Sequence, residues 1–413
     1  MISQLFGPTT SAPLQVLIVD DELRVLDGMR RALYRVRDRW EIDTASGGED
    51  ALRKLSEKPA DIVITDLRMP GMDGISLLET VAQSWPATVR MILSGQEDAA
   101  TGTRATQVAH QYLSKPSDAE AVIAALGRAT SAVRLLRDPA MRAMAGCLSS
   151  LPTTPKVLLK IQELTVNDGA AFGDLATLIA GDAALTAKLL QLVNSAYFGV
   201  ARAVTKVEQA INVIGFQLLR ALIISQEITH AFPCSWPSWS AEKEQQHAML
   251  VGTVAQAMGD SQADRCDLFT AGVLHDVGML VLASRAPTML MTAMLHAERS
   301  GDAFHVAEAE LHGVTHADVG AYLLGLWGLP WSLVEAVGMH HSPDAWRSAS
   351  TTIPAKVAFA EQLVNAVHKP DGIAQASAEM LESELFVILG DVPTRERLLS
   401  RAVTALQKGG SRD

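Results

Sequence analysis

Three aspartates, a serine and a lysine have the residue types that phosphoryl transfer requires. Each follows a short apolar run: Asp20 and Asp21 after the first, Asp66 after the third, Ser94 at the end of the fourth and Lys115 after the fifth. Converging carboxylates repel one another unless a hard cation neutralises them, and Mg²⁺ favours a few carboxylates with water and phosphate oxygens. With that cation bound, Asp66 could attack a phosphoryl group whose oxygens Ser94 and Lys115 hold.

A second group, in the C-terminal half, has the residue types of a transition-metal site. Six of the eleven histidines fall there, and an aspartate adjoins one of them: His247, His275, His312, His316, His340 and His341, with Asp276. Imidazole and carboxylate are the usual ligands of Mn, Fe and Zn. A single histidine is more often a core or surface residue than a ligand, so the group alone leaves metal binding open.

The elements that must position the first group alternate between strands and helices. Apolar runs at 15–19, 41–45, 61–65, 91–94 and 111–114 are separated by amphipathic segments at 23–37, 48–57, 74–84 and 98–109, and a long helix over 118–137 follows. Parallel strands need crossover helices, so the alternation predicts a doubly wound, flavodoxin-like α/β domain with a five-stranded parallel sheet. Such sheets bind ligands at the carboxyl ends of their strands, where these polar residues fall.

After about residue 117 the pattern is helical almost to the end, which predicts an all-α second half. The expected organisation is a flexible N-terminus over 1–13, the α/β domain over 14–135, a linker over 136–145, a helical domain over 146–345, and a C-terminal helical extension over 346–413 that packs on it.

Composition excludes several classes of protein. The chain has 413 residues, of which 48% are hydrophobic, and a net charge of −11, which is typical of a globular protein and disfavours direct nucleic-acid binding. Its three cysteines form no CxxC pair, as expected in a reducing cytosol. Because no basic leader and no window of about 18 uncharged apolar residues occurs, we expect a cytoplasmic protein without membrane contact.

The motifs around the first group closely resemble the receiver domain of two-component response regulators. They are VDDE at 19–22, TDLRMPGMDG at 65–74, SG at 94–95 and YLSKP at 112–116. The resemblance implies Asp66 as phosphoacceptor and a sensor histidine kinase or phosphotransfer protein as donor. It implies as Mg²⁺ ligands Asp20, Asp21, Asp66 and the backbone carbonyl of Arg68, and as phosphate-contact and switch residues Ser94, Tyr112 and Lys115.

Segments of the second half look like the HDOD domain, a relative of HD-type phosphohydrolases. They are LPTTP at 151–155, GDAALTAKLLQLVNSAYFG at 181–199, QAINVIGFQLL at 209–219, AGVLHDVGML at 271–280, THADVGAYLLGLWGLP at 315–330 and HH at 340–341. HDOD domains are regarded as output or scaffolding modules without an established common reaction. The resemblance therefore implies a non-catalytic module that binds an unknown downstream signalling protein, and it leaves homodimer formation open.

A His-Asp dyad inside a helix resembles the HD signature, and that pattern implies the other candidate ligands. The candidate site is His247, His275, Asp276, His316, His340, His341 and Glu361. Glu361 replaces an expected aspartate, and Met279 stands where HD-GYP cyclic-dinucleotide phosphodiesterases carry a lysine. Without that cation the developing phosphoryl charge loses stabilisation. We expect a vestigial site that is open to a divalent metal such as Mn or Fe but does not hydrolyse; the alternative is a phosphorylation-controlled, metal-dependent phosphodiesterase.

Overall fold

The computed structural model describes most of the chain in separate segments. They are 13–36, 39–94, 108–114, 119–136, 138–146, 172–194, 200, 203–215, 239–367, 371–382 and 384–409. Lys115, the N-terminal residues 1–12 and nearly all of the helix expected over 98–109 lie outside them. The α/β domain and the helical region are each described by themselves.

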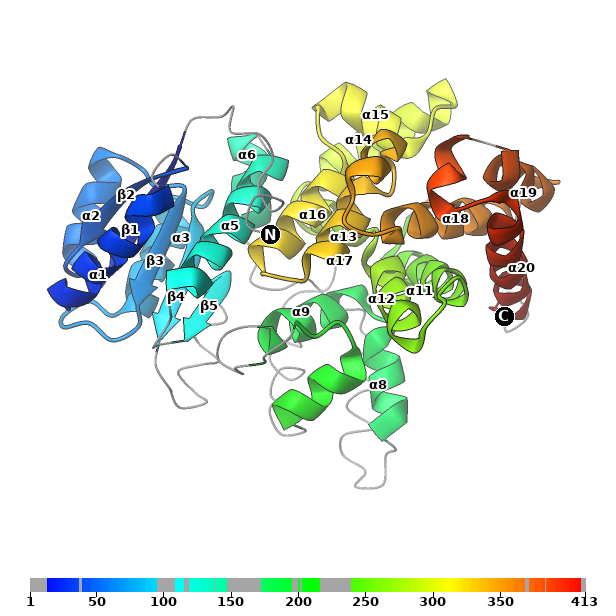
Figure 1. Ribbon diagram of the computed structural model, residues 1–413. Coiled ribbons are helices and arrows are strands. Elements are labelled where there is room, and N and C mark those ends of the chain that lie inside the picture. Colours follow the sequence, from blue (N-terminus) through cyan, green and yellow to red (C-terminus); the bar gives the residue numbers. More distant parts are fainter. Residues whose placement is uncertain are drawn as a thin grey trace. The chain divides into compact units, whose positions relative to one another are not determined.

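The α/β domain is built on a parallel sheet (Figure 1). Its strands are β1 (Leu14–Val19), β2 (Trp40–Ala45), β3 (Ile62–Asp66), β4 (Val89–Ser94) and β5 (Gln111–Ser114), in the spatial order β2-β1-β3-β4-β5. The central strands are almost wholly buried, and near-continuous runs of Val, Ile and Leu suit strands that are covered on both faces. Strand order reverses between β1 and β3, and open α/β sheets generally bind ligands at the carboxyl ends of the strands at such a point.

Helices cover both faces of this sheet. They are α1 (Leu23–Leu33), α2 (Gly48–Glu57), α3 (Gly74–Ser84) and α5 (Ala119–Leu135). Contacts join α1 to α5 and α2 to α3, so the two pairs lie on opposite faces (Figure 1). Asp73 caps α3 by accepting a hydrogen bond from the Ser76 backbone N–H at 2.7 Å. The coarse prediction, a parallel α/β domain followed by a mostly helical region, is confirmed.

Part of the segment expected as a linker forms a helix, α6 (Pro139–Gly146), which is fixed to the α/β domain. The carbonyl of Gly146 accepts hydrogen bonds from the Arg90 guanidinium at 2.7 Å and from His110 Nε2 at 2.9 Å. A Cβ on Gly146 would lie 2.8 Å from the carbonyl oxygen of Pro86, so this close approach requires glycine.

The helical region contains α8 (Phe172–Ala180), α9 (Ala183–Val193), α11 (Ala241–Ala257), α12 (Gln262–Leu274), α13 (Val277–Arg285), α14 (Pro287–Ser300), α15 (Phe304–His312), α16 (His316–Leu326), α17 (Trp331–Met339), α18 (Ile353–Ala366), α19 (Gly372–Glu382) and α20 (Val392–Gly409). The C-terminal helices pack on the preceding ones: α18 contacts α11, α12 and α17, and α20 contacts α11.

Glycines let two pairs of these helices approach closely. A Cβ on Gly272 of α12 would lie 2.6 Å from the Cα atom of Gly252 in α11. A Cβ on Gly278 of α13 would lie 1.9 Å from the carbonyl oxygen of His316 in α16. These contacts hold α11 against α12 and α13 against α16.

One described stretch, Ala263–Arg285, is long and apolar enough to cross a membrane by length and composition. The share of its apolar window that is buried inside the protein is 82%, and the stretch breaks between α12 and α13. We therefore interpret it as a core segment, because core helices pass the same test.

Candidate functional site

The carboxylates of Asp20, Asp21 and Asp66 converge at the carboxyl ends of β1 and β3, with ligand oxygens within 4.8 Å of one another. Asp20 is buried and accepts a hydrogen bond from the Glu22 backbone N–H at 2.9 Å, and Asp66 accepts one from the Leu67 N–H at 2.8 Å. Three converging carboxylates fit a hard cation with oxygen ligands, as Mg²⁺ is.

Strand register explains this convergence. Val19 pairs with Thr65, so the residues that follow them, Asp20 and Asp66, lie at neighbouring strand ends. Asp66 in turn pairs with Leu93, which places the backbone of Ser94 one residue further along β4. Ser94 in turn pairs with Ser114. The side chain of Ser94 lies outside the described atoms.

The other residues expected at this rim are described in part or not at all. Arg68 is exposed and lies in the loop between β3 and α3, two residues beyond Asp66. Tyr112 lies on β5 opposite Ile92, but its side chain, like Lys115, is outside the described part of the chain. Their expected roles stay predictions.

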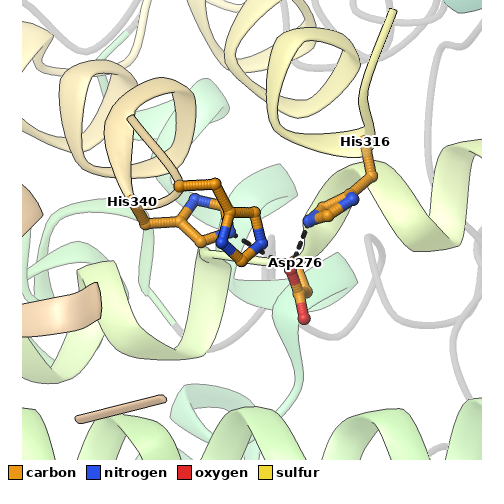
Figure 2. A group of neighbouring side chains, drawn as sticks. Asp276, His316 and His340 are labelled. Atoms are coloured by element: carbon orange, nitrogen blue, oxygen red, sulfur yellow. Dashed lines mark ion pairs between the residues drawn. The ribbon is translucent and has the colours of Figure 1, made fainter. Parts of the chain in front are cut away.

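Asp276 pairs with His316 and His340 (Figure 2), and it lies at the centre of a cluster that also contains His247 and His275. Its Oδ1 atom lies 3.0 Å from Nε2 of His316 and 3.5 Å from Nε2 of His340. Its Oδ2 atom lies 3.1 Å from Nε2 of His275 and 3.9 Å from Nε2 of His247. Each carboxylate oxygen therefore faces two imidazole nitrogens.

The potential ligand atoms form two groups that share Asp276. One is Asp276, His316, His340 and His341, and the other is His247, His275, Asp276 and Glu361; within each group the atoms lie within 4.8 Å of one another. The Glu361 carboxylate also lies 3.8 Å from Nδ1 of His341. A bridging carboxylate with imidazoles on both sides suits two adjacent cations.

Hydrogen bonds orient the rings of His275 and His340. Nδ1 of His275 lies 2.7 Å from the Gly272 carbonyl oxygen, and Nδ1 of His340 lies 2.7 Å from the Val337 carbonyl oxygen. Each Nδ1 is therefore a donor, which leaves Nε2 directed at Asp276. Among the described residues, the buried Nε2 atoms of His275, His316 and His340 and Oδ1 of Asp276 have no partner of normal hydrogen-bond geometry. Such a donor set fits Mn²⁺, Fe²⁺ or Zn²⁺.

The expectation that the His-Asp dyad lies inside a helix is wrong. Helix α12 ends at Leu274, His275 is its C-cap, and α13 begins at Val277. Asp276 has φ −101° and ψ 20°, outside the α-helical region, and this break lets two consecutive side chains face the same centre.

Burial and charge act against each other in the cluster. Burial, the largest influence, lowers the pKa of His275, but attraction to Asp276, Glu361 and Glu244 outweighs it and raises the pKa to about 9. Burial raises the pKa of Asp276, but His275 and His316 outweigh it and hold the pKa well below its usual value. Burial lowers the pKa of both His247 and His341, and neighbouring imidazoles add to this. The cluster therefore holds protons where a cation would otherwise stabilise Asp276.

Family models match both parts of the chain. The model of the response regulator receiver domain matches residues 16–127, and that of the HDOD domain matches residues 151–343. The chain carries a receiver domain followed by an HDOD domain.

Curated relatives match parts of the chain. An uncharacterized protein of Treponema pallidum is 30% identical over 232 residues, which are 54% of this chain and 43% of that protein. The receiver domain is similar to the hydrogenase transcriptional regulatory protein HoxA of Cupriavidus necator, which is 33% identical over 30% of this chain and 25% of that protein. The chain thus spans less than half the length of either relative.

A virulence factor of Campylobacter jejuni has a similar solved structure, with a TM-score of 0.52 and 20% identity over 66% of this chain and 98% of that one. At this identity the likeness supports the fold alone.

The structure brings together all seven residues of the predicted HDOD site, whereas His312 lies elsewhere, with its Nε2 atom 3.1 Å from the Met289 carbonyl oxygen. Met279 is buried in α13.

Two acidic residues near the HDOD site were missed by sequence reasoning. Glu308 contacts His316, and Glu244 lies one turn before His247 in α11. Burial, followed by repulsion from Asp276, raises the pKa of Glu244 to about 8. The spacing of Glu244 and His247, i and i+3 on one helix, is the one signal that could have indicated either residue.

Proposed function

We propose that this chain is a response regulator that is phosphorylated on Asp66 and signals through its HDOD domain. The observation that carries the proposal is the convergence of Asp20, Asp21 and Asp66 at the strand ends where the sheet order reverses. A receiver domain implies a phosphodonor, either a sensor histidine kinase or a phosphotransfer protein. The downstream partner is proposed to be a cytoplasmic signalling protein.

Each residue at the receiver rim has a proposed task. Asp20, Asp21, Asp66 and the Arg68 carbonyl would hold Mg²⁺, which offsets negative charge between the carboxylates and the incoming phosphoryl group. Asp66 is the nucleophile because it ends the strand adjacent to both β1 and β4. Ser94 and Lys115 would contact the phosphoryl oxygens, and Tyr112 would follow the movement of Ser94.

Acetyl phosphate labelling tests the phosphoacceptor. We expect the full chain to incorporate phosphate in the presence of Mg²⁺, and Asp66→Asn to abolish incorporation. Asp43→Asn, an exposed carboxylate on β2 that pairs with Lys54, is the matched control and should label like wild type. Incorporation by Asp66→Asn at the wild-type rate would show that the assignment is wrong.

We propose further that the HDOD domain binds a divalent metal such as Mn²⁺ or Fe²⁺ at the cluster around Asp276. Two observations support this proposal. Imidazole and carboxylate atoms converge in two groups that share Asp276, and several of the buried atoms among them have no hydrogen bond of normal geometry within the described residues. Metal would stabilise the Asp276 carboxylate in place of the protons that His275 holds. Metal analysis of the purified full chain tests this, with His275→Ala as the variant expected to lose metal.

The second candidate function is a metal-dependent phosphodiesterase. The observation in its favour is that candidate ligands lie on both sides of Asp276, an arrangement that the sequence motifs alone did not reveal. Against it stands Met279, whose thioether cannot offset phosphoryl charge. We therefore propose an output module without useful hydrolysis. Turnover of a cyclic dinucleotide with Mn²⁺ or Fe²⁺ faster than about 1 s⁻¹, lost in His275→Ala, would establish the enzyme instead.

A further inference from the structure

Glu308 of α15 is a buried carboxylate, 2% exposed, that contacts one ligand of the proposed metal site. Its Oε2 atom lies 2.5 Å from Nδ1 of His316, and its two oxygens lie 3.1 and 3.2 Å from the His316 backbone nitrogen. The opposite ring nitrogen of His316, Nε2, lies 3.0 Å from Oδ1 of Asp276. The three groups thus form a continuous line from Glu308 to the centre of the cluster.

His316 needs an acceptor from another element because of its place in its helix. His275 and His340 lie at the C-terminal ends of α12 and α17, where carbonyl groups lack helical partners, and each uses the carbonyl three residues earlier. His316 is instead the first residue of α16 and has no such carbonyl before it. Glu308 supplies a charged acceptor where the other two rings use a neutral one.

Capping of α16 accounts for only part of the role of Glu308, which accepts from the His316 backbone N–H but lies closer to the His316 ring. Thr315 and Asp318 already form a reciprocal cap: the Asp318 carboxylate accepts from the Thr315 backbone N–H at 2.9 Å, and the Thr315 hydroxyl accepts from the Asp318 N–H at 3.2 Å. A buried carboxylate is costly to desolvate unless a specific partner compensates it. The partners here are the His316 backbone N–H and, at the shortest distance, the His316 ring.

We propose that Glu308 is a positioning residue for a divalent cation on the His316 side of Asp276, an inference that rests on the proposed metal function. By accepting the Nδ1 proton, Glu308 fixes the tautomer of His316 so that the Nε2 lone pair points at the cation, and its charge makes Nε2 a stronger donor. Phe304, stacked on the His316 ring with centroids 5.6 Å apart, holds the ring plane.

Titration of Co²⁺ into the chelator-stripped full chain tests this, with the visible absorption of bound Co²⁺ as a second readout. Glu308→Gln keeps an oxygen acceptor but removes the charge, and we expect about 10- to 100-fold weaker Co²⁺ binding and a changed spectrum. The matched control is Glu335→Gln, because Glu335 is also a buried glutamate but accepts from the Ser350 backbone N–H and belongs to neither ligand group. It should bind Co²⁺ like wild type.

The outcomes separate the inference from the function on which it rests. If wild type does not bind Co²⁺, the metal function fails and the inference falls with it. If wild type binds and Glu308→Gln binds within twofold of it with an unchanged spectrum, the inference alone is overturned. A merely structural role for Glu308 would lower thermal stability without changing the Co²⁺ spectrum.

A measurement on the wild-type chain keeps the inference testable should Glu308→Gln not fold. Imidazole ¹⁵N chemical shifts in the Zn²⁺-loaded protein should show His316 bound through Nε2 and protonated at Nδ1. A His316 bound through Nδ1, or unprotonated there, would contradict the proposal.

Discussion

Gly278 lies directly against the backbone of His316, where a Cβ atom would come within 1.9 Å of the carbonyl oxygen. Gly278→Ala should therefore push α13 away from α16 and separate Asp276 from His316. We expect a loss of about 1–3 kcal/mol of stability, as for overpacked cores, and a lower metal content at equal protein concentration. Thermal unfolding and metal analysis measure the two effects.

Gly173→Ala is the control for this substitution. Gly173 lies in α8, and a Cβ there would have no atom within 4 Å, so alanine should leave stability unchanged or raise it by about 0.5–1 kcal/mol. Equal metal content in wild type and Gly278→Ala would contradict the role given to this contact.

Gly74 lies against the backbone of Asp66, as Gly278 lies against that of His316. A Cβ on Gly74 would lie 2.1 Å from the Asp66 carbonyl oxygen, so Gly74→Ala must displace the end of β3. Displacements of about 1 Å can cost about a hundredfold in rate, and we expect acetyl phosphate labelling to slow accordingly. Gly28→Ala on α1, where a Cβ would meet nothing within 4 Å, should label normally. Normal labelling of Gly74→Ala would mean that the strand end tolerates the shift.

Asp276→Asn should reduce bound metal more than any other single substitution in the cluster. Asp276 is shared by both ligand groups, whereas Glu361 belongs to one of them. We expect Asp276→Asn to lose metal from both sides and Glu361→Gln to retain part of it. Metal-to-protein ratios after gel filtration decide this, and equal ratios in the two variants would argue against a shared ligand.

Metal-free protein should lose stability as pH rises from about 7 to 9. In the folded state the pKa is raised to about 8 for Glu244 and to about 9 for His275, above 4.5 and 6.5 for the free groups. The folded protein therefore binds protons in this window that the unfolded chain has already released. Each of these two groups lowers the free energy of unfolding by up to about 1.4 kcal/mol per pH unit, until the pH passes the pKa of that group in the folded state. The lowered pKa values of His247 and His341 act in the opposite direction, but only below about pH 6.5.

Denaturant unfolding at several pH values measures this effect. Metal-loaded protein should show a weaker decline, because ligands must release their protons to bind metal. A metal-free stability that stays flat or rises between pH 7 and 9 would contradict the prediction.

Phosphorylation should change the end of the receiver domain. Movement of Ser94 and Tyr112 would reach α5, which follows the strand that carries Tyr112, and a shift of a few kcal/mol is enough to change state. Hydrogen exchange with and without beryllofluoride should differ over 110–140. Unchanged protection throughout that range would exclude this route.

Sequence patterns predicted the strands and helices of the receiver domain closely, because each of these elements is determined mainly by residues near one another in the sequence. The helix expected over 74–84 is α3, and the strand expected over 111–114 is β5. Apolar runs between turn residues determine buried parallel strands, and the acidic residues follow those runs directly. The parallel register of neighbouring strands then brings these acidic residues together at the carboxyl ends, so no long-range contact has to be predicted separately.

The HDOD cluster was predicted as a list of ligands but not as an arrangement. Its geometry depends on contacts between helices that are not neighbours in sequence, such as Gly278 of α13 with His316 of α16, and periodicity does not encode such contacts. Glu308 was missed because its only link to the site is through space to His316. The break at Asp276 was missed because the apolar pattern runs on from α12 into α13.

The anchoring of Gly146 by Arg90 and His110 determines where the chain leaves the receiver domain. Arg90 is near the start of β4 and His110 precedes β5, so the exit lies at the amino ends of the strands, opposite to the carboxyl ends where Asp66 lies. At about 3.3 Å per residue, β4 spans roughly 13 Å between Arg90 and Ser94. If β4 tilts at its carboxyl end, near Ser94, its amino end near Arg90 would move as well. Because Arg90 donates to Gly146, this movement would displace α6.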